Sequence, residues 1–136
     1  MTPEQQLVEE LHERFEPLVG LLPLSNQPIA WSWIEQAAAR LSLQLADPQD
    51  APEAALEILE ALDPDEQWWR TPLGMEVARS ADVSGRGVTQ ADAAKILGVT
   101  GGTVSQLVHR GTLPHSSDGG VDLAAVLERL VRLERS

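Results

Sequence analysis

The most regular pattern of apolar and polar positions in this chain lies between residues 88 and 111. Two runs there carry apolar residues at helical spacing, and each follows a threonine, Thr89 or Thr100, whose hydroxyl can cap the first turn. Gly98 separates the runs, because glycine takes the left-handed conformation that ends a helix. The pattern predicts two helices joined by a tight turn, with Val99 pointing back to the core. The inner positions are Ala93, Ile96 and Leu97 in the first helix and Val104, Leu107 and Val108 in the second.

A small hairpin and a last helix are predicted after this pair. Residues 115–121 place Gly119 and Gly120 between two short runs, which indicates a β-hairpin with a glycine turn. Asp122 stands where it can cap a further helix. The apolar positions of that helix are Leu123, Val126, Leu127, Leu130, Val131 and Leu133.

The order helix, turn, helix, small wing and helix resembles the winged helix-turn-helix of the MerR and excisionase families. The resemblance rests on residues 89–100, 103–108, 111–114 and 119–120, and it covers about residues 86–135 of the chain. It implies binding to double-stranded DNA, with the second helix in the major groove and the wing on the adjacent backbone. It implies nothing about the DNA sequence that is bound.

The outward side chains of the second helix suit contacts with DNA. Thr100, Thr103 and the neighbouring backbone N–H groups can reach phosphates or thymine methyl groups. Gln106 can pair with adenine, and Arg110 can reach guanine or a phosphate. The predicted DNA contacts, two of them from the wing, are Thr100, Gly102, Thr103, Ser105, Gln106, His109, Arg110, His115 and Ser116.

Two features depart from the pattern of those families. Gly101 and Gly102 stand where relatives commonly carry a basic residue, and the wing offers His115 and Ser116 in place of lysine or arginine. Two glycines weaken the start of a helix by about 1 kcal/mol each relative to alanine, yet they also let the backbone approach a phosphate closely. The alternative to DNA binding is a scaffold of this fold whose exposed face contacts protein.

Residues 1–82 are predicted to form an all-helical domain of about four helices, so the predicted fold class is mainly α. Pro17 limits the first helix, the second runs from about residue 25 to 43, the third lies between residues 50 and 63, and Pro72 starts the fourth. The most linker-like stretch is residues 81–87. It places the boundary with the second domain between residues 82 and 83.

Tryptophans dominate the aromatic content of this first part. In the second helix, Ile29, Trp33, Ala37 and Leu41 repeat every four residues, which assigns Trp33 to the core. Burial also suits Trp68 and Trp69, but adjacent side chains point in different directions, and tryptophan is favoured at interface hot spots. We therefore predict a dimer or partner interface at Trp68, Trp69 and Leu73.

Charge divides the chain unequally. The net charge of the whole chain is −11, but residues 83–136 carry +1 and residues 1–82 carry −12. A charge of +1 is small for a DNA-binding module, because phosphate neutralisation supplies most non-specific affinity. We therefore expect modest, salt-sensitive binding by one copy, with the acidic domain forming a homodimer or binding a partner protein.

Other classes of function find little support. The chain has no cysteine, and its three histidines, His12, His109 and His115, lack ligand spacing, so no metal or cofactor is expected. Carboxylates lie in runs typical of a solvated helix face, so no enzyme is expected. No apolar run is long enough to span a membrane, and the N-terminus lacks a basic secretory start, so we expect a cytoplasmic protein.

The sequence therefore predicts a sequence-specific DNA-binding protein, a transcriptional regulator of bacterial or phage type that acts as a dimer. The first alternative is an antitoxin or an excisionase-like architectural factor, whose N-terminal domain binds a partner protein. The second is a protein-interaction module that uses the helix-turn-helix only as a scaffold.

Overall fold

The computed structural model describes residues 1–83, 85–117 and 119–135, and 72% of the chain is helical, which confirms the mainly α fold class. The described residues form seven α-helices and one two-stranded sheet. They divide into two compact units, residues 1–63 (unit 1) and residues 64–136 (unit 2). The division falls between Asp63 and Pro64, rather than between residues 82 and 83 as predicted. Within the described ranges, no helix has the length and apolar character needed to cross a bilayer.

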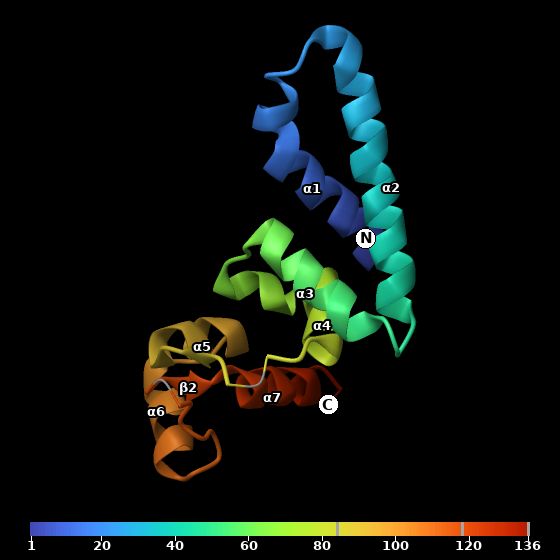
Figure 1. Ribbon diagram of the computed structural model, residues 1–136. Helices are drawn as coiled ribbons and strands as arrows, with labels where there is room; N and C mark the ends of the chain where they lie inside the picture. Colours follow the sequence, from blue (N-terminus) through green and yellow to red (C-terminus); the bar gives the residue numbers. More distant parts are fainter. Residues whose placement is uncertain (84, 118, 136) are drawn as a thin grey trace. The chain divides into compact units, whose positions relative to one another are not determined.

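Unit 1 contains α1 (Pro3–Val19), α2 (Gln27–Ala46) and α3 (Ala51–Leu62), with the short 3-10 helix η1 (Leu24–Asn26) between the first two (Figure 1). α1 and α2 pack as an antiparallel hairpin, and α3 contacts both helices. α1 continues through Pro17, so the prediction that Pro17 limits it is wrong. The helix is kept after the proline because the Gly20 N–H still donates to the Glu16 carbonyl at 2.9 Å. The buried side chains include Leu7, Leu11, Ala38, Leu41, Ala55 and Ile58.

The assignment of Trp33 to the core is wrong, because its side chain is 67% exposed. A four-residue repeat drifts around a helix by about 40° at each step, so its two ends face different directions. The C-terminal end of the repeat, at Leu41, is buried, whereas Ile29 at the other end is exposed. Trp31 is half-buried and packs against α1, where its ring stacks on the imidazole of His12 at 4.1 Å between centroids.

Unit 2 starts with the 3-10 helix η2 (Glu66–Arg70) and α4 (Pro72–Ser80) and continues with β1 (Gly87–Val88), α5 (Gln90–Leu97), α6 (Gly101–His109), β2 (Val121–Asp122) and α7 (Leu123–Arg135). β1 and β2 are antiparallel, with Val88 opposite Val121. α7 packs on α4 and on α5, and η2 packs on the same two helices. Residues 64–82 therefore pack with the rest of unit 2 and contribute side chains to its core, which is why the boundary lies earlier than predicted. The side chains most deeply buried in this unit are Leu73, Val77, Ile96, Leu113, Val104, Val121, Val126 and Leu127.

The stretch predicted as a linker, residues 81–87, is part of this packing where it is described. Val83 is buried, and the Leu123 N–H at the start of α7 donates to the Arg86 carbonyl at 3.0 Å. Leu133, predicted as an apolar inner position of α7, is exposed.

Trp68 and Trp69 are buried within unit 2, with 6% and 7% of their surfaces exposed, and Leu73 is 1% exposed. The prediction that these three residues form a dimer or partner interface is therefore wrong. The Asp65 carboxylate caps η2 by accepting from the Trp68 N–H at 3.0 Å. Adjacent side chains of a 3-10 helix diverge by about a third of a turn. Both indoles are nevertheless buried because η2 packs against two helices, α4 and α5, and the rings meet edge to face, with centroids 5.4 Å apart.

Gly74 permits this arrangement by letting α4 approach the backbone of η2. A Cβ atom at position 74 would collide with the Trp68 carbonyl oxygen and would lie 2.7 Å from the Trp69 Cα. Neither obstacle is the mobile end of a side chain, so neither atom can move without displacing η2.

We expect Gly74→Ala to lower the free energy of unfolding by about 1–3 kcal/mol, the usual cost of forcing an extra methyl group into a packed site. Urea denaturation followed by tryptophan fluorescence measures the change. Gly101→Ala is the matched control, because a Cβ there meets nothing within 4 Å. Equal midpoints for the two variants would contradict the close approach as a requirement of the fold.

Candidate nucleic-acid interface

The two threonine caps predicted for α5 and α6 are present. The Thr89 Oγ1 accepts from the Asp92 N–H at 3.1 Å, and the Thr100 Oγ1 accepts from the Thr103 N–H at 3.2 Å. The hydroxyl oxygens of Thr100 and Thr103 also lie 2.9 Å apart. The side chains of Thr100 and Thr103 are therefore held in place at the start of α6. The two residues between them, Gly101 and Gly102, have no side chain that could obstruct a ligand.

The turn between α5 and α6 depends on Gly98. It has φ +68° and ψ 34°, the left-handed conformation, and the next N–H, of Val99, donates to the Ala94 carbonyl at 3.0 Å. The guanidinium of Arg70, which ends η2, lies where a Cβ of residue 98 would be. A cation at this place also complements the C-terminal end of the α5 dipole. Val99, predicted to point to the core, remains 37% exposed.

The outer face of α6 carries the predicted contact residues. Val104 is fully buried, and Leu107 and Val108 are half-buried, so the helix turns its opposite side to solvent. The exposed residues on that side are Thr103, Ser105, Gln106, His109 and Arg110, and the last four line a shallow depression along the helix. Thr100 and Gly102 are also exposed, at the N-terminal end of the same helix.

Three polar side chains on this face are not used within the fold. In the described part of the chain, the side chains of Gln106, His109 and Arg110 make no hydrogen bond or ion pair with another residue. Such groups are satisfied by solvent, and they are available to an external acceptor or donor. Arg110 adds a permanent positive charge at the C-terminal end of α6.

Local packing does not require glycine at positions 101 and 102. A Cβ at Gly101 would meet nothing within 4 Å, and one at Gly102 would meet only the Thr100 Oγ1, at 3.9 Å. Neither residue has a positive φ. Their lack of side chains therefore leaves the first N–H groups of α6 uncovered, in an orientation that favours an anion.

The predicted hairpin over residues 115–121 is present in part, and residue 118 of it lies outside the described residues. Residues His115 and Val121 form an antiparallel bridge, and the Ser116 N–H donates to the Gly120 carbonyl at 2.7 Å. The main pairing partner of β2 is β1, a strand that the pattern of residues does not predict. Gly120 is required there, because its Cβ would lie 2.7 Å from the Val88 carbonyl oxygen. His115 is exposed and Ser116 is half-buried at the base of the turn.

Sequence reasoning missed two cations that the fold presents near these elements. Lys95 is exposed on the last turn of α5, and Arg70 is brought to the turn before α6 by the packing of η2 on α5. The helical period placed Lys95 on the outer side of α5 and could have indicated it. Nothing local in the sequence indicates Arg70, because the contact joins distant segments.

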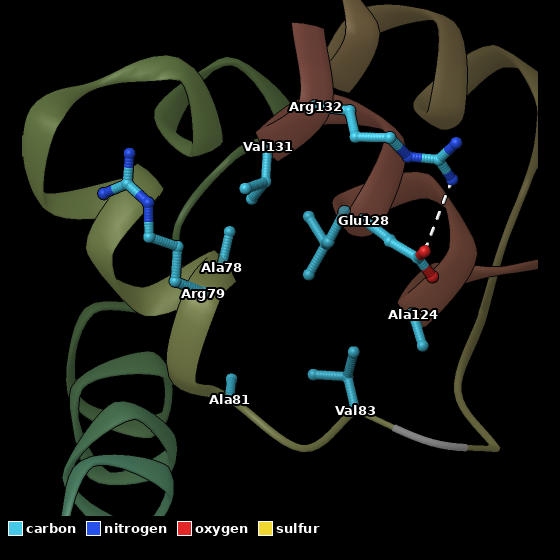
Figure 2. Close-up of a pocket in the computed structure, with 9 residues that line it drawn as sticks. Ala78, Arg79, Ala81, Val83, Ala124, Glu128, Val131 and Arg132 are labelled. Atoms are coloured by element: carbon cyan, nitrogen blue, oxygen red, sulfur yellow. Dashed lines mark hydrogen bonds and ion pairs between the residues drawn. The ribbon is translucent and has the colours of Figure 1, made fainter. Parts of the chain in front are cut away.

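A separate hollow of about 410 Å³ lies between α4 and α7 (Figure 2). Its apolar lining includes Ala78, Val83, Leu127 and Val131. Its charged groups are already paired, because Arg132 contacts Glu128 at 3.3 Å and Arg79 contacts Glu76 at 2.8 Å. The described residues contain no group of histidines and carboxylates able to hold a metal ion. The outer face of α6 is therefore the better candidate for a functional site.

Comparison of the chain with protein-family models, curated proteins and solved structures found no match.

We expect Gly98→Ala to lower the free energy of unfolding by about 1–2 kcal/mol, because a side chain is strained at this positive φ and Arg70 must move. Chemical denaturation of the whole chain measures the effect. Gly102→Ala, four residues later, serves as the control and should not destabilise the fold. A Gly98→Ala variant as stable as the control would show that the turn does not need glycine.

Proposed function

We propose that unit 2 contains a winged helix-turn-helix that binds double-stranded DNA with a sequence preference, and that the protein acts as a transcriptional regulator. The observation that supports the proposal most strongly is the outer face of α6. It combines a capped N-terminus, two glycines that packing does not require, and the side chains of Gln106, His109 and Arg110, which have no partners among the described residues. Such a helix offers hydrogen-bond donors and acceptors that can pair with base edges and phosphates.

In this proposal α6 lies in the major groove. The uncovered N–H groups at Gly101 and Gly102 bind a backbone phosphate and fix the register of the helix. Gln106 pairs with adenine, and Arg110, one turn further on, binds guanine or a second phosphate. Residues 115–117 and 119–120 rest on the adjacent backbone as the wing.

The charge of the molecule limits the affinity of this contact. Unit 1 has twelve acidic and two basic residues, a net charge of −10, and unit 2 has a net charge of −1. Unit 1 therefore repels phosphate, which lowers binding to arbitrary DNA. Binding then depends on the direct contacts of α6, and selectivity is gained at the expense of affinity.

The same charge favours a second candidate function. A near-neutral unit 2 with few cations on its exposed helix also suits an interaction module that uses this fold to contact protein. In that case the outer face of α6 binds a polar protein surface. The protein then has no specific affinity for DNA, and substitutions on this face have no such affinity to remove.

Gln106→Ala together with Arg110→Ala should abolish the preference for a selected DNA sequence. The preferred sequence is first enriched from a pool of randomised duplexes with the wild-type protein. Fluorescence anisotropy over a KCl series then compares it with a scrambled duplex. Loss of a bidentate contact to a base costs about 1–3 kcal/mol, which is roughly 5- to 150-fold in the dissociation constant. The double variant should bind both duplexes as weakly as the wild type binds the scrambled one.

Arg14→Ala is the control for this experiment. It removes the same charge from an exposed position on α1, and it should leave the preference intact. Failure to enrich any sequence, or a double variant that binds like the wild type, would reject DNA recognition by α6. Circular dichroism of each variant verifies that the fold is retained.

Gly101→Ala with Gly102→Ala should separate stability from binding. Alanine favours the helix by up to about 1 kcal/mol per site, so the urea midpoint should rise. The two methyl groups hold a phosphate away from the N–H groups, so the affinity for the selected duplex should fall. Unchanged affinity in a stabilised protein would mean that these glycines do not admit a phosphate.

A further inference from the structure

The free end of the α1–α2 hairpin carries a concentration of exposed apolar side chains. Its large side chains are only partly covered: Leu18 is 58% exposed, Leu21 81%, Leu22 41%, Leu24 83%, Ile29 51% and Trp33 67%. These six residues, here called the hairpin tip, come from the end of α1, from the connection with η1, and from the start of α2 (Figure 1). Soluble monomers rarely leave such a concentration of large apolar groups in water, and apolar patches of this kind mark interaction surfaces.

The hairpin tip is also free of charge. Residues 17–34 contain no aspartate, glutamate, lysine, arginine or histidine, although the unit carries a net charge of −10. Glu16 and Glu35 flank this neutral segment at its two ends. The composition of such an acidic unit would place charged residues in a segment of this length. Their absence indicates a surface that becomes buried when it binds a partner.

The described residues of unit 1 do not cover the tip. The core of the unit lies among Leu7, Leu11 and Ile58, towards the other end of the hairpin. Between this core and the tip, His12 stacks on Trp31 and its Nε2 lies 3.7 Å from the Glu35 carboxylate. At the tip, Val19 is buried, while its neighbours Leu18, Leu21 and Leu22 remain exposed.

We infer that the hairpin tip binds the hairpin tip of a second copy, which makes the protein a homodimer through unit 1. The net charge of unit 1 and the absence of charge in residues 17–34 favour a second copy as the occupant. Nucleic acids and anionic membranes are repelled by the −10 of unit 1, whereas a second copy presents a neutral apolar surface and buries no charge. The acidic helix faces repel one another, so the tip is the face through which two copies can meet at low cost. A two-fold contact between identical patches also closes on itself.

The number of residues at the hairpin tip determines the affinity that we expect for the dimer. Stable interfaces use on the order of 20–30 residues from each partner, and residues 17–34 supply a number just below this range. Electrostatic repulsion between two acidic units opposes the association further. We therefore expect a dissociation constant in the micromolar range, which falls as salt screens the repulsion.

This inference does not depend on the proposed DNA binding, and its test uses no DNA. Sedimentation equilibrium of the full chain, from about 1 to 200 μM, should show a transition from 14.8 kDa towards twice that mass. Raising the salt concentration should strengthen the dimer. A mass that stays monomeric throughout, or an association that weakens with salt, would overturn the proposal.

Leu24→Glu and Trp33→Glu should each weaken the dimer at least tenfold, because each buries a carboxylate in an apolar contact. Both positions are largely exposed, so the fold tolerates the charge, and circular dichroism checks this. Leu43→Glu is the matched control, since Leu43 is 76% exposed on the same helix but lies about 15 Å from Trp33 along the helix axis. Dimerisation should survive in this control. Equal weakening by all three substitutions would assign the effect to added charge and overturn the role of the tip.

Discussion

The arrangement of unit 2 depends on the contact between the backbones of α4 and η2. Gly74 makes the contact possible, since no side chain fits between it and the Trp68 carbonyl. The contact fixes a 3-10 turn that buries two adjacent indoles beside α5, and the same turn carries Arg70 to the end of α5. The geometry of α5, of Gly98 and of the start of α6 is therefore supported from a segment that precedes all three in the chain.

Local signals in the sequence predicted local structure well. The threonine caps at Thr89 and Thr100 and the left-handed Gly98 follow from interactions within four residues, and all three are confirmed. The inner positions Ile96 and Val104 follow from helical period, and both are buried. The exposed face of α6 consists of the residues that lie between these apolar positions. Their placement on the surface was therefore also predictable.

The wrong predictions concern contacts between distant segments. The period of α2 did not show which part of its apolar repeat faces a neighbour, and Trp33 is exposed as a result. The break at residues 81–87 resembled a linker because glycine and serine gather there, yet Val83 is buried and β1 starts within the stretch. Trp68 and Trp69 were assigned to an interface because adjacent side chains point in different directions, which makes the burial of two indoles in one small domain demanding. Both are covered because η2 packs against α4 and α5, and these contacts between separate segments leave no simple mark in the sequence.

The distribution of the tryptophans gives each unit its own optical character. Trp31 and Trp33 belong to unit 1, where one stacks on His12 and the other is largely in water, and Trp68 and Trp69 form a buried pair in unit 2. Indole emission shifts to longer wavelength in water, and a rigid edge-to-face pair gives strong near-ultraviolet circular dichroism. Intrinsic spectroscopy can therefore follow the two units separately in one unlabelled sample, with emission at the red edge reporting on unit 1 and dichroism reporting on unit 2.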